Sequence, residues 1–189
     1  MRLSPDFAAA LAFAAHLHEG QKRKGTQIPY VAHLLIVAGL VLEYGGTEDE
    51  AIAALLHDAV EDQGGRATLH RIQRRFGSAV AGIVEACSDT DVEPKPEWRQ
   101  RKEQYLSHLS QASASVKLVS AADKLHNATA ILRDYRNLGE EVWKRFSGGK
   151  EGTLWNYRAL VKAYGTAENR PIVLDLDRVV SELERLASI

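Results

Sequence analysis

The chain is poor in cysteine and has no excess of charge of either sign. One cysteine, Cys87, occurs in 189 residues, so no disulfide can form within the chain and a reducing cytoplasm is the expected compartment. The formal net charge of −1 gives nucleic acid or an acidic membrane no general attraction. No apolar run approaches the length of about 20 residues that spans a bilayer. We therefore expect a small-molecule partner rather than nucleic acid or a membrane, with a homo-oligomer left open.

Apolar residues recur with helical periodicity along nearly the whole chain. Ser4, Pro5 and Asp6 are typical of a helix start, so we interpret the apolar stretch behind them as a buried helix rather than a signal peptide. Glycines and capping residues separate the segments. The expected helices are 5–19, 29–44, 48–62, 68–76, 78–88, 97–111, 114–136, 139–146, 150–164 and 171–187. The pattern predicts an all-α fold of about 8–10 helices, forming one domain over residues 1–189.

The most informative segment is the run Ala53-Ala54-Leu55-Leu56-His57-Asp58-Ala59-Val60-Glu61-Asp62. At about 100° per residue, the four ionisable side chains at its end span an arc of about 140° on a helix. Carboxylates gathered beside a core repel one another and are costly to desolvate. A divalent cation removes this conflict, so the run predicts a metal site, with a structural role as the alternative.

Two distant segments carry further polar groups. The cationic loop that contains Lys22, Arg23 and Lys24 leads into a helix with His33 in its first turn. Further along, Asp123 and Asn127 share a helix face among apolar neighbours. Each feature also has an ordinary explanation: a solvated loop, a hydrogen-bonded core histidine, and a local ion pair between Asp123 and its neighbouring lysine.

The order of these groups resembles the HD phosphohydrolase superfamily. More narrowly, residues from about 5 to about 160 resemble the hydrolase domain of the RelA/SpoT alarmone enzymes and their small single-domain relatives. The matching residues are His18-Glu19-Gly20-Gln21, Arg23-Lys24, Pro29-Tyr30, His33, His57-Asp58-Ala59-Val60-Glu61-Asp62 and Ala122-Asp123-Lys124-Leu125-His126-Asn127. The resemblance implies a single HD-domain helical bundle that removes the 3′-pyrophosphate of ppGpp or pppGpp, leaving GDP or GTP.

The resemblance also implies roles for individual residues. The metal ligands would be His33, His57, Asp58 and Asp123, and this mixture of imidazole and carboxylate donors suits one Mn²⁺ ion per chain. The acidic pair that orients and deprotonates the water would be Glu61 and Asp62.

Substrate contacts follow from the same resemblance. Arg23 and Lys24 would pack against the base and approach the phosphates, and Asn127 would bond near the ribose. Lys102 is a candidate for the distal phosphate, with a solvated helix face as the alternative. Further candidates to line the pocket are Trp155, Tyr157 and Arg158, although the two aromatic residues also fit a core stripe.

The chain departs from the family pattern in two places. Leu34 stands where proline often follows the first metal histidine, and Ala130 stands where the long enzymes carry threonine. The lost hydroxyl leaves open a preference for adenosine alarmones such as ppApp. Two other readings stay open: an HD nucleotidase that acts on nucleoside 5′-phosphates, and a nucleotide-binding sensor without activity.

Overall fold

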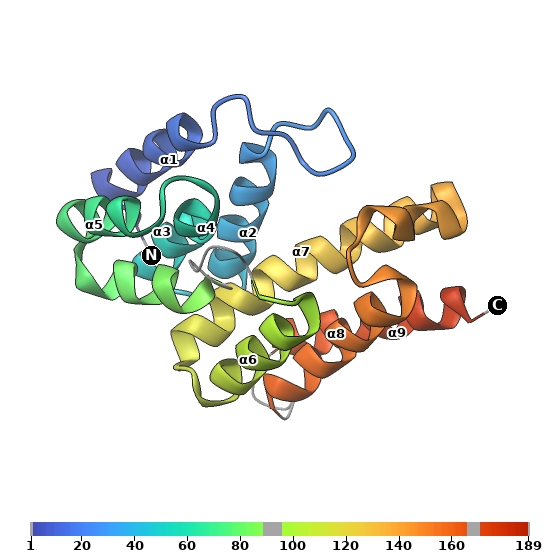
Figure 1. Cartoon of the computed structure of the whole chain (residues 1–189). Coiled ribbons are helices and arrows are strands. Elements are labelled where there is room, and N and C mark those ends of the chain that lie inside the picture. The colour runs from blue at the N-terminus through green and yellow to red at the C-terminus, as the bar shows by residue number, and fades with distance from the viewer. Residues whose placement is uncertain (1, 89–95, 166–170, 189) are drawn as a thin grey trace.

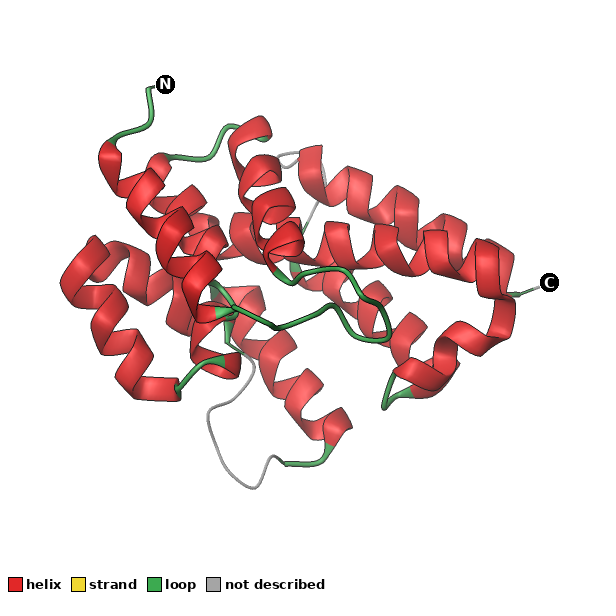
Figure 2. Ribbon diagram, turned by 90° about the horizontal axis from the view of Figure 1, so that it is seen from above, coloured by secondary structure: helices red, strands yellow, loops and turns green. Residues whose placement is uncertain are grey.

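The computed structural model describes residues 2–88, 96–165 and 171–188. Within these residues the regular structure is helical, apart from an isolated bridge between Lys22 and Pro29 (Figures 1 and 2). The helices are α1 (Pro5–Leu17), α2 (Val31–Glu43), α3 (Glu48–Leu56), α4 (Ala59–Asp62), α5 (Gly65–Cys87), α6 (Trp98–Gln111), α7 (Ala114–Leu138), the 3₁₀-helix η1 (Gly139–Arg145), α8 (Gly149–Ala163) and α9 (Pro171–Ala187). The predicted all-α class is confirmed.

Several helix starts follow directly from local chemistry. The Ser4 hydroxyl accepts a hydrogen bond from the backbone N–H of Asp6 at the start of α1. Thr47 and Glu50 form a reciprocal capping box at the start of α3. Gly77 has φ 89° and ψ 169°, which divides α5 into two helical parts, as the separate predictions for 68–76 and 78–88 require.

The prediction of one helix over residues 48–62 is wrong. α3 ends at Leu56 and α4 begins at Ala59, so the His57-Asp58 pair lies in the turn between them. The cause is local. His57 Nδ1 lies 2.8 Å from the Ala54 carbonyl, the group that the N–H of Asp58 would bond in a continuous helix. Asp58 adopts φ −94° and ψ −2°, which turns the chain at this point.

The helix α7 is the element on which the other parts of the fold converge. It runs diagonally through the middle of the molecule and packs against α2, α3 and α5 on one side and against α9 and η1 on the other (Figure 1). In α3, every residue from Ala51 to Leu56 is at most 3% exposed. This burial fixes the α3–α4 turn against α7, because moving α3 would expose several apolar side chains at about 1.5–3 kcal/mol for each large one.

Helix α6 is joined to α8 through a close aromatic contact. The Trp98 indole lies against Gly148 and Gly152, and a Cβ atom at Gly148 would be 2.6 Å from the Trp98 ring. Trp98 also meets Trp155 edge to face, with ring centroids 6.3 Å apart. These contacts set the position of α6 along α8.

Within the described residues, none of the helices combines the length and the apolar character that crossing a membrane requires.

Candidate active site

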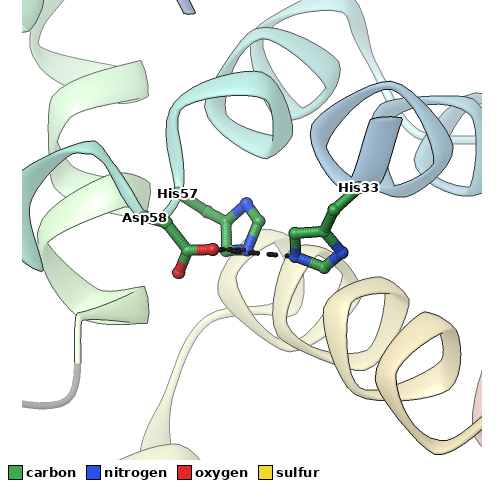
Figure 3. A group of neighbouring side chains, drawn as sticks. All are labelled: His33, His57 and Asp58. Atoms are coloured by element: carbon green, nitrogen blue, oxygen red, sulfur yellow. Dashed lines mark ion pairs between the residues drawn. The ribbon is translucent and has the colours of Figure 1, made fainter. Parts of the chain in front are cut away.

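The structure brings together the four residues predicted as metal ligands. Figure 3 shows His33, from α2, and His57 and Asp58, from the α3–α4 turn, with their side chains pointing toward one another. These three residues offer donor atoms that all lie within 4.8 Å of one another. Asp123 approaches from α7, with its Oδ1 atom 3.2 Å from His33 Nε2 and 3.6 Å from His57 Nε2. Asp58 Oδ2 lies 3.0 Å from His57 Nε2 and 3.6 Å from His33 Nε2.

Both imidazole rings present a buried nitrogen to this centre. The Nε2 atoms of His33 and His57 have no hydrogen-bond partner within the described part of the chain. The opposite nitrogens are engaged: His57 Nδ1 donates to the Ala54 carbonyl, and His33 Nδ1 lies 2.6 Å from His126 Nδ1. A hydrogen bond that holds the proton on Nδ1 leaves the Nε2 lone pair available to a cation.

Buried charges dominate the electrostatics of the cluster. Burial opposes a charge on His57, but the carboxylates of Asp58 and Asp123 outweigh it and raise the pKa of His57 well above its usual value. Burial also opposes ionisation of Asp58, yet His57 and His33 hold the pKa of this carboxyl below its usual range. The two carboxylates therefore favour positive charge between them, which a proton or a metal ion can supply.

Neighbouring side chains orient both carboxylates. Tyr30 Oη donates to Asp58 Oδ2 at 2.6 Å. On α7, Asn127 Nδ2 donates to Asp123 Oδ1 at 2.5 Å, and the Lys124 ammonium donates to Asp123 Oδ2. Burial opposes the charge of Asp123, but Lys124 and the two histidines lower the pKa of this carboxyl well below its usual value.

The predicted acidic pair lies on α4, directly beyond the turn that carries His57 and Asp58. Glu61 is half-buried and Asp62 is exposed. Asp62 Oδ2 accepts a hydrogen bond of 2.8 Å from Gln21 Nε2. Gln21 Oε1 in turn accepts from Gln63 Nε2 at 2.6 Å, so the start of the cationic loop is tied to α4.

A cavity of about 260 Å³ lies beside Asn127, one helical turn from Asp123. Arg23, Lys24 and Asn127, the candidates for substrate contacts, are among the residues that line it, and Arg23 donates to Asn127 Oδ1 at 2.5 Å. Tyr157 also lines it, but Trp155 and Arg158 do not. They lie at a different surface pocket, where α8 meets α9 and Arg158 is bound by Asp177 and Glu184.

Lys102 lies on α6, is half-buried, and is not among the residues that line this cavity. Its expected contact with the distal phosphate therefore stays a prediction.

Comparison with known proteins places this geometry in a family. The sequence pattern of the HD domain family matches residues 10–154. The chain belongs to the HD domain family. It is 41% identical over 137 residues to the guanosine-3′,5′-bis(diphosphate) 3′-pyrophosphohydrolase MESH1 of Xenopus tropicalis. This alignment covers 71% of this chain and 72% of the relative. The chain is 31% identical over 175 residues to MESH1 of Drosophila melanogaster, which covers 91% and 92% of the two chains.

A solved structure, described as a metazoan orthologue of SpoT that hydrolyses ppGpp and plays a role in starvation responses, shares the fold. It aligns with a TM-score of 0.78 and 26% identity over 99% of both chains. The resemblance to HD-domain proteins of the RelA/SpoT type that the sequence indicates is confirmed.

The HD domain implies a divalent metal ion, and the residues present fit one. The fit rests on two buried imidazole nitrogens that lack a hydrogen-bond partner among the described residues and face two carboxylates, whose mutual repulsion a cation relieves.

Several residues of this HD-domain site are not evident as site residues from the sequence. Tyr30 and His126 were recognised only as parts of a motif, although each lies three residues from a predicted ligand and so shares its helical face. The far wall of the cavity was missed altogether. It includes Asp134, two turns beyond Asn127 on α7, and Arg145 and Phe146 at the end of η1; none of the three carries a local signal.

Proposed function

We propose that this protein hydrolyses the 3′-pyrophosphate of guanosine 3′,5′-bis(diphosphate), releasing GDP and pyrophosphate, and converts pppGpp to GTP and pyrophosphate in the same way. The observation that carries the proposal is the pair of buried histidine Nε2 atoms, which lack a hydrogen-bond partner in the part of the chain that the structure describes and lie 3.0–3.6 Å from two carboxylates, beside a cavity lined by cationic residues. The relatives support it, because MESH1 is named for this reaction and the aligned SpoT orthologue is described as hydrolysing ppGpp.

In this proposal His33, His57, Asp58 and Asp123 hold one Mn²⁺ ion. Imidazole and carboxylate donors together suit a transition metal more than Mg²⁺ or Ca²⁺, which take oxygen ligands. When bound, such an ion polarises the scissile phosphate and makes water a better nucleophile near neutral pH.

Glu61 and Asp62 then act on the attacking water. Both follow the His57-Asp58 turn by a single helical turn, so their position is fixed by the same backbone that presents two of the ligands. We assign Glu61, the more buried of the two, to accept the proton of the water. Asp62 orients the water and is itself held by Gln21.

The cavity takes the nucleoside while the phosphates extend toward the histidines. Arg23 lines the cavity and is hydrogen-bonded to Asn127, and the Arg23 guanidinium lies 5.7 Å from the centre of the Tyr30 ring. This anchoring leaves the planar guanidinium able to stack on a base or bind phosphate oxygens, while Lys24 adds a second positive charge. Lys102 completes the proposal as the contact to the distal phosphate.

The decisive experiment is a product assay on metal-free protein with and without added Mn²⁺. We expect ppGpp to yield GDP and pyrophosphate only with the metal. Release of single phosphate from dAMP or dGMP, with ppGpp untouched, would indicate a nucleotidase instead. Binding of ppGpp without turnover in Mn²⁺ would indicate a sensor.

We further propose that residues 1–189 form one HD domain and that the protein works in the cytoplasm. The first proposal is supported by α9, which lies beyond the matched residues 10–154 but packs against α7 and α8. The second is supported by the single cysteine, since disulfides mark oxidising compartments.

A further inference from the structure

The cavity contains a carboxylate that the proposed hydrolysis does not use. Asp134 lies on α7 eleven residues after Asp123, which is about three turns or 16 Å along the helix axis and within about 20° of the same face. Asn127 lies between them on that face. The helix α7 thus carries Asp123, a proposed metal ligand, at one end of the site and Asp134 at the other.

Besides its cationic residues, the cavity that contains Asp134 has apolar side chains that suit a flat ring. Ile131, Val142, Phe146 and Tyr157 line the cavity together with the aliphatic Ile28 of the cationic loop. The cavity volume of about 260 Å³ lies just below the range of about 300–1,000 Å³ typical of pockets for whole ligands, which suits a nucleobase with its phosphates outside.

Asp134 is held in place within this cavity. Its Oδ2 atom accepts a 2.7 Å hydrogen bond from Arg145 Nη1, and the two side chains are 22% and 25% exposed. Arg145 is itself confined, because the loop passes so close at Gly25 that a Cβ atom there would lie 2.9 Å from Arg145 Nε. A weaker bond of 3.4 Å comes from Arg133 Nε to Asp134 Oδ1. Since a carboxylate has about four lone-pair positions, Asp134 can still accept further hydrogen bonds.

We propose that Asp134, positioned by Arg145, selects guanine over adenine in this cavity. The inference rests on the proposed function, since it names the substrate base of that same site. Guanine presents two adjacent donors, N1–H and the 2-amino group, which pair with one carboxylate. Adenine presents the N1 lone pair at the same edge and has no 2-amino group, so the carboxylate repels it. The absent hydroxyl at Ala130 then does not redirect the site to adenosine alarmones.

The test is equilibrium binding of GDP, ADP and IDP to the metal-free protein by calorimetry, which does not depend on turnover. We expect the affinity of the unaltered protein for GDP to exceed its affinity for ADP by a factor of about 10 or more. IDP, which keeps N1–H but lacks the 2-amino group, should bind more weakly than GDP. Equal binding of GDP and ADP, or of GDP and IDP, would overturn the inference without any variant.

Asp134→Asn keeps the shape of the side chain but replaces one acceptor by a donor. It should therefore weaken the binding of GDP about 10-fold or more and bring the ratio of GDP affinity to ADP affinity close to one. Asp177→Asn is the matched control, because Asp177 also pairs with an arginine but lies on α9, where it contacts Arg158 of α8, and is not among the residues that line the cavity. It should leave the ratio unchanged. A guanine preference that survives Asp134→Asn would overturn the assignment.

Kinetics separate this inference from the proposed function. If ppGpp is hydrolysed, Asp134→Asn should lower the ratio of kcat/KM for ppGpp over ppApp through KM. If ppGpp is not hydrolysed while GDP binding still depends on Asp134, the proposed reaction is wrong and the assignment of the base pocket stands.

Discussion

His33 Nδ1 and His126 Nδ1 lie 2.6 Å apart, and their rings stack with centroids separated by 4.8 Å. Only one proton fits between the two nitrogens. If His33 binds a metal through Nε2, then its Nδ1 carries that proton and His126 Nδ1 must accept it. Burial, with His33 and Arg23 nearby, lowers the pKa of His126 to about 4, so His126 is neutral and able to accept near pH 7.

Replacing His126 should therefore weaken metal binding without removing a ligand. We expect His126→Ala to raise the Kd for Mn²⁺ about 10- to 100-fold, the usual effect of losing a group that orients a ligating histidine. His126→Asn places an amide oxygen near the Nδ1 position and should restore most of the affinity. Calorimetric titration with Mn²⁺ measures both variants. Equal losses in the two would show that the hydrogen bond is not what matters.

The raised pKa of His57 predicts how stability depends on pH. A group whose pKa is higher in the folded protein than its ordinary 6.5 stabilises the fold fully below pH 6.5, and this contribution is lost as pH rises through the folded pKa. Melting curves of the metal-free protein should thus show Tm falling above pH 6.5. Since protons compete with metal for the ring, the increase in Tm caused by Mn²⁺ should be larger at pH 8 than at pH 6. The same increase at both pH values would contradict the role of His57 as a ligand.

Glu61→Gln should separate metal binding from catalysis. The amide keeps the size of the side chain but cannot take a proton, so we expect kcat to fall by about 10²- to 10⁴-fold while Mn²⁺ affinity stays unchanged. His57→Ala should abolish both together. Loss of the metal in Glu61→Gln would mean that Glu61 is a ligand rather than the base.

Tyr30→Phe tests the hydrogen bond that holds Asp58. The ring would keep its stacking on His18, whose centroid lies 5.1 Å away, and only the 2.6 Å bond to Asp58 would be lost. Burial and the charge of Asp58 raise the pKa of Tyr30, so the hydroxyl donates throughout the usual pH range. We expect weaker Mn²⁺ binding, by about 10-fold, with the metal-free Tm lowered by only a few degrees. An unchanged Kd would show that Asp58 does not need this support.

Arg23→Ala should act on substrate binding. Arg23 lines the cavity and is fixed by Asn127, so its loss should raise KM for ppGpp about 10-fold and leave kcat within a few-fold. Lys22→Ala is the matched control, because Lys22 is exposed in the same loop and bonds Gln27. A change in KM for the control as large as that for Arg23→Ala would point to a general charge effect.

The sequence predicts this site well where the signal is local and poorly where it depends on packing. His57 and Asp58 are adjacent and follow a buried segment, so their joint role is visible in the sequence. The helix break between them was missed, because it arises from the ring of His57 taking the Ala54 carbonyl, which periodicity does not encode.

The contact of Gln21 with Asp62 joins residues 41 positions apart, and Asp134 meets Arg145 only because η1 folds back on α7. Such pairs depend on how helices pack, so single residue types and spacings do not reveal them.

The close packing of the Trp98 indole against Gly148 and Gly152 has a consequence for Lys102, which lies on α6. Any side chain at Gly148 would displace the indole and with it the start of α6, where Lys102 lies one turn beyond Trp98. The placement of that ammonium group is thus governed from α8, at a residue with no charge of its own. If Lys102 contacts the distal phosphate as proposed, a substitution at Gly148 would change the reach of this lysine without altering a group that contacts the nucleotide.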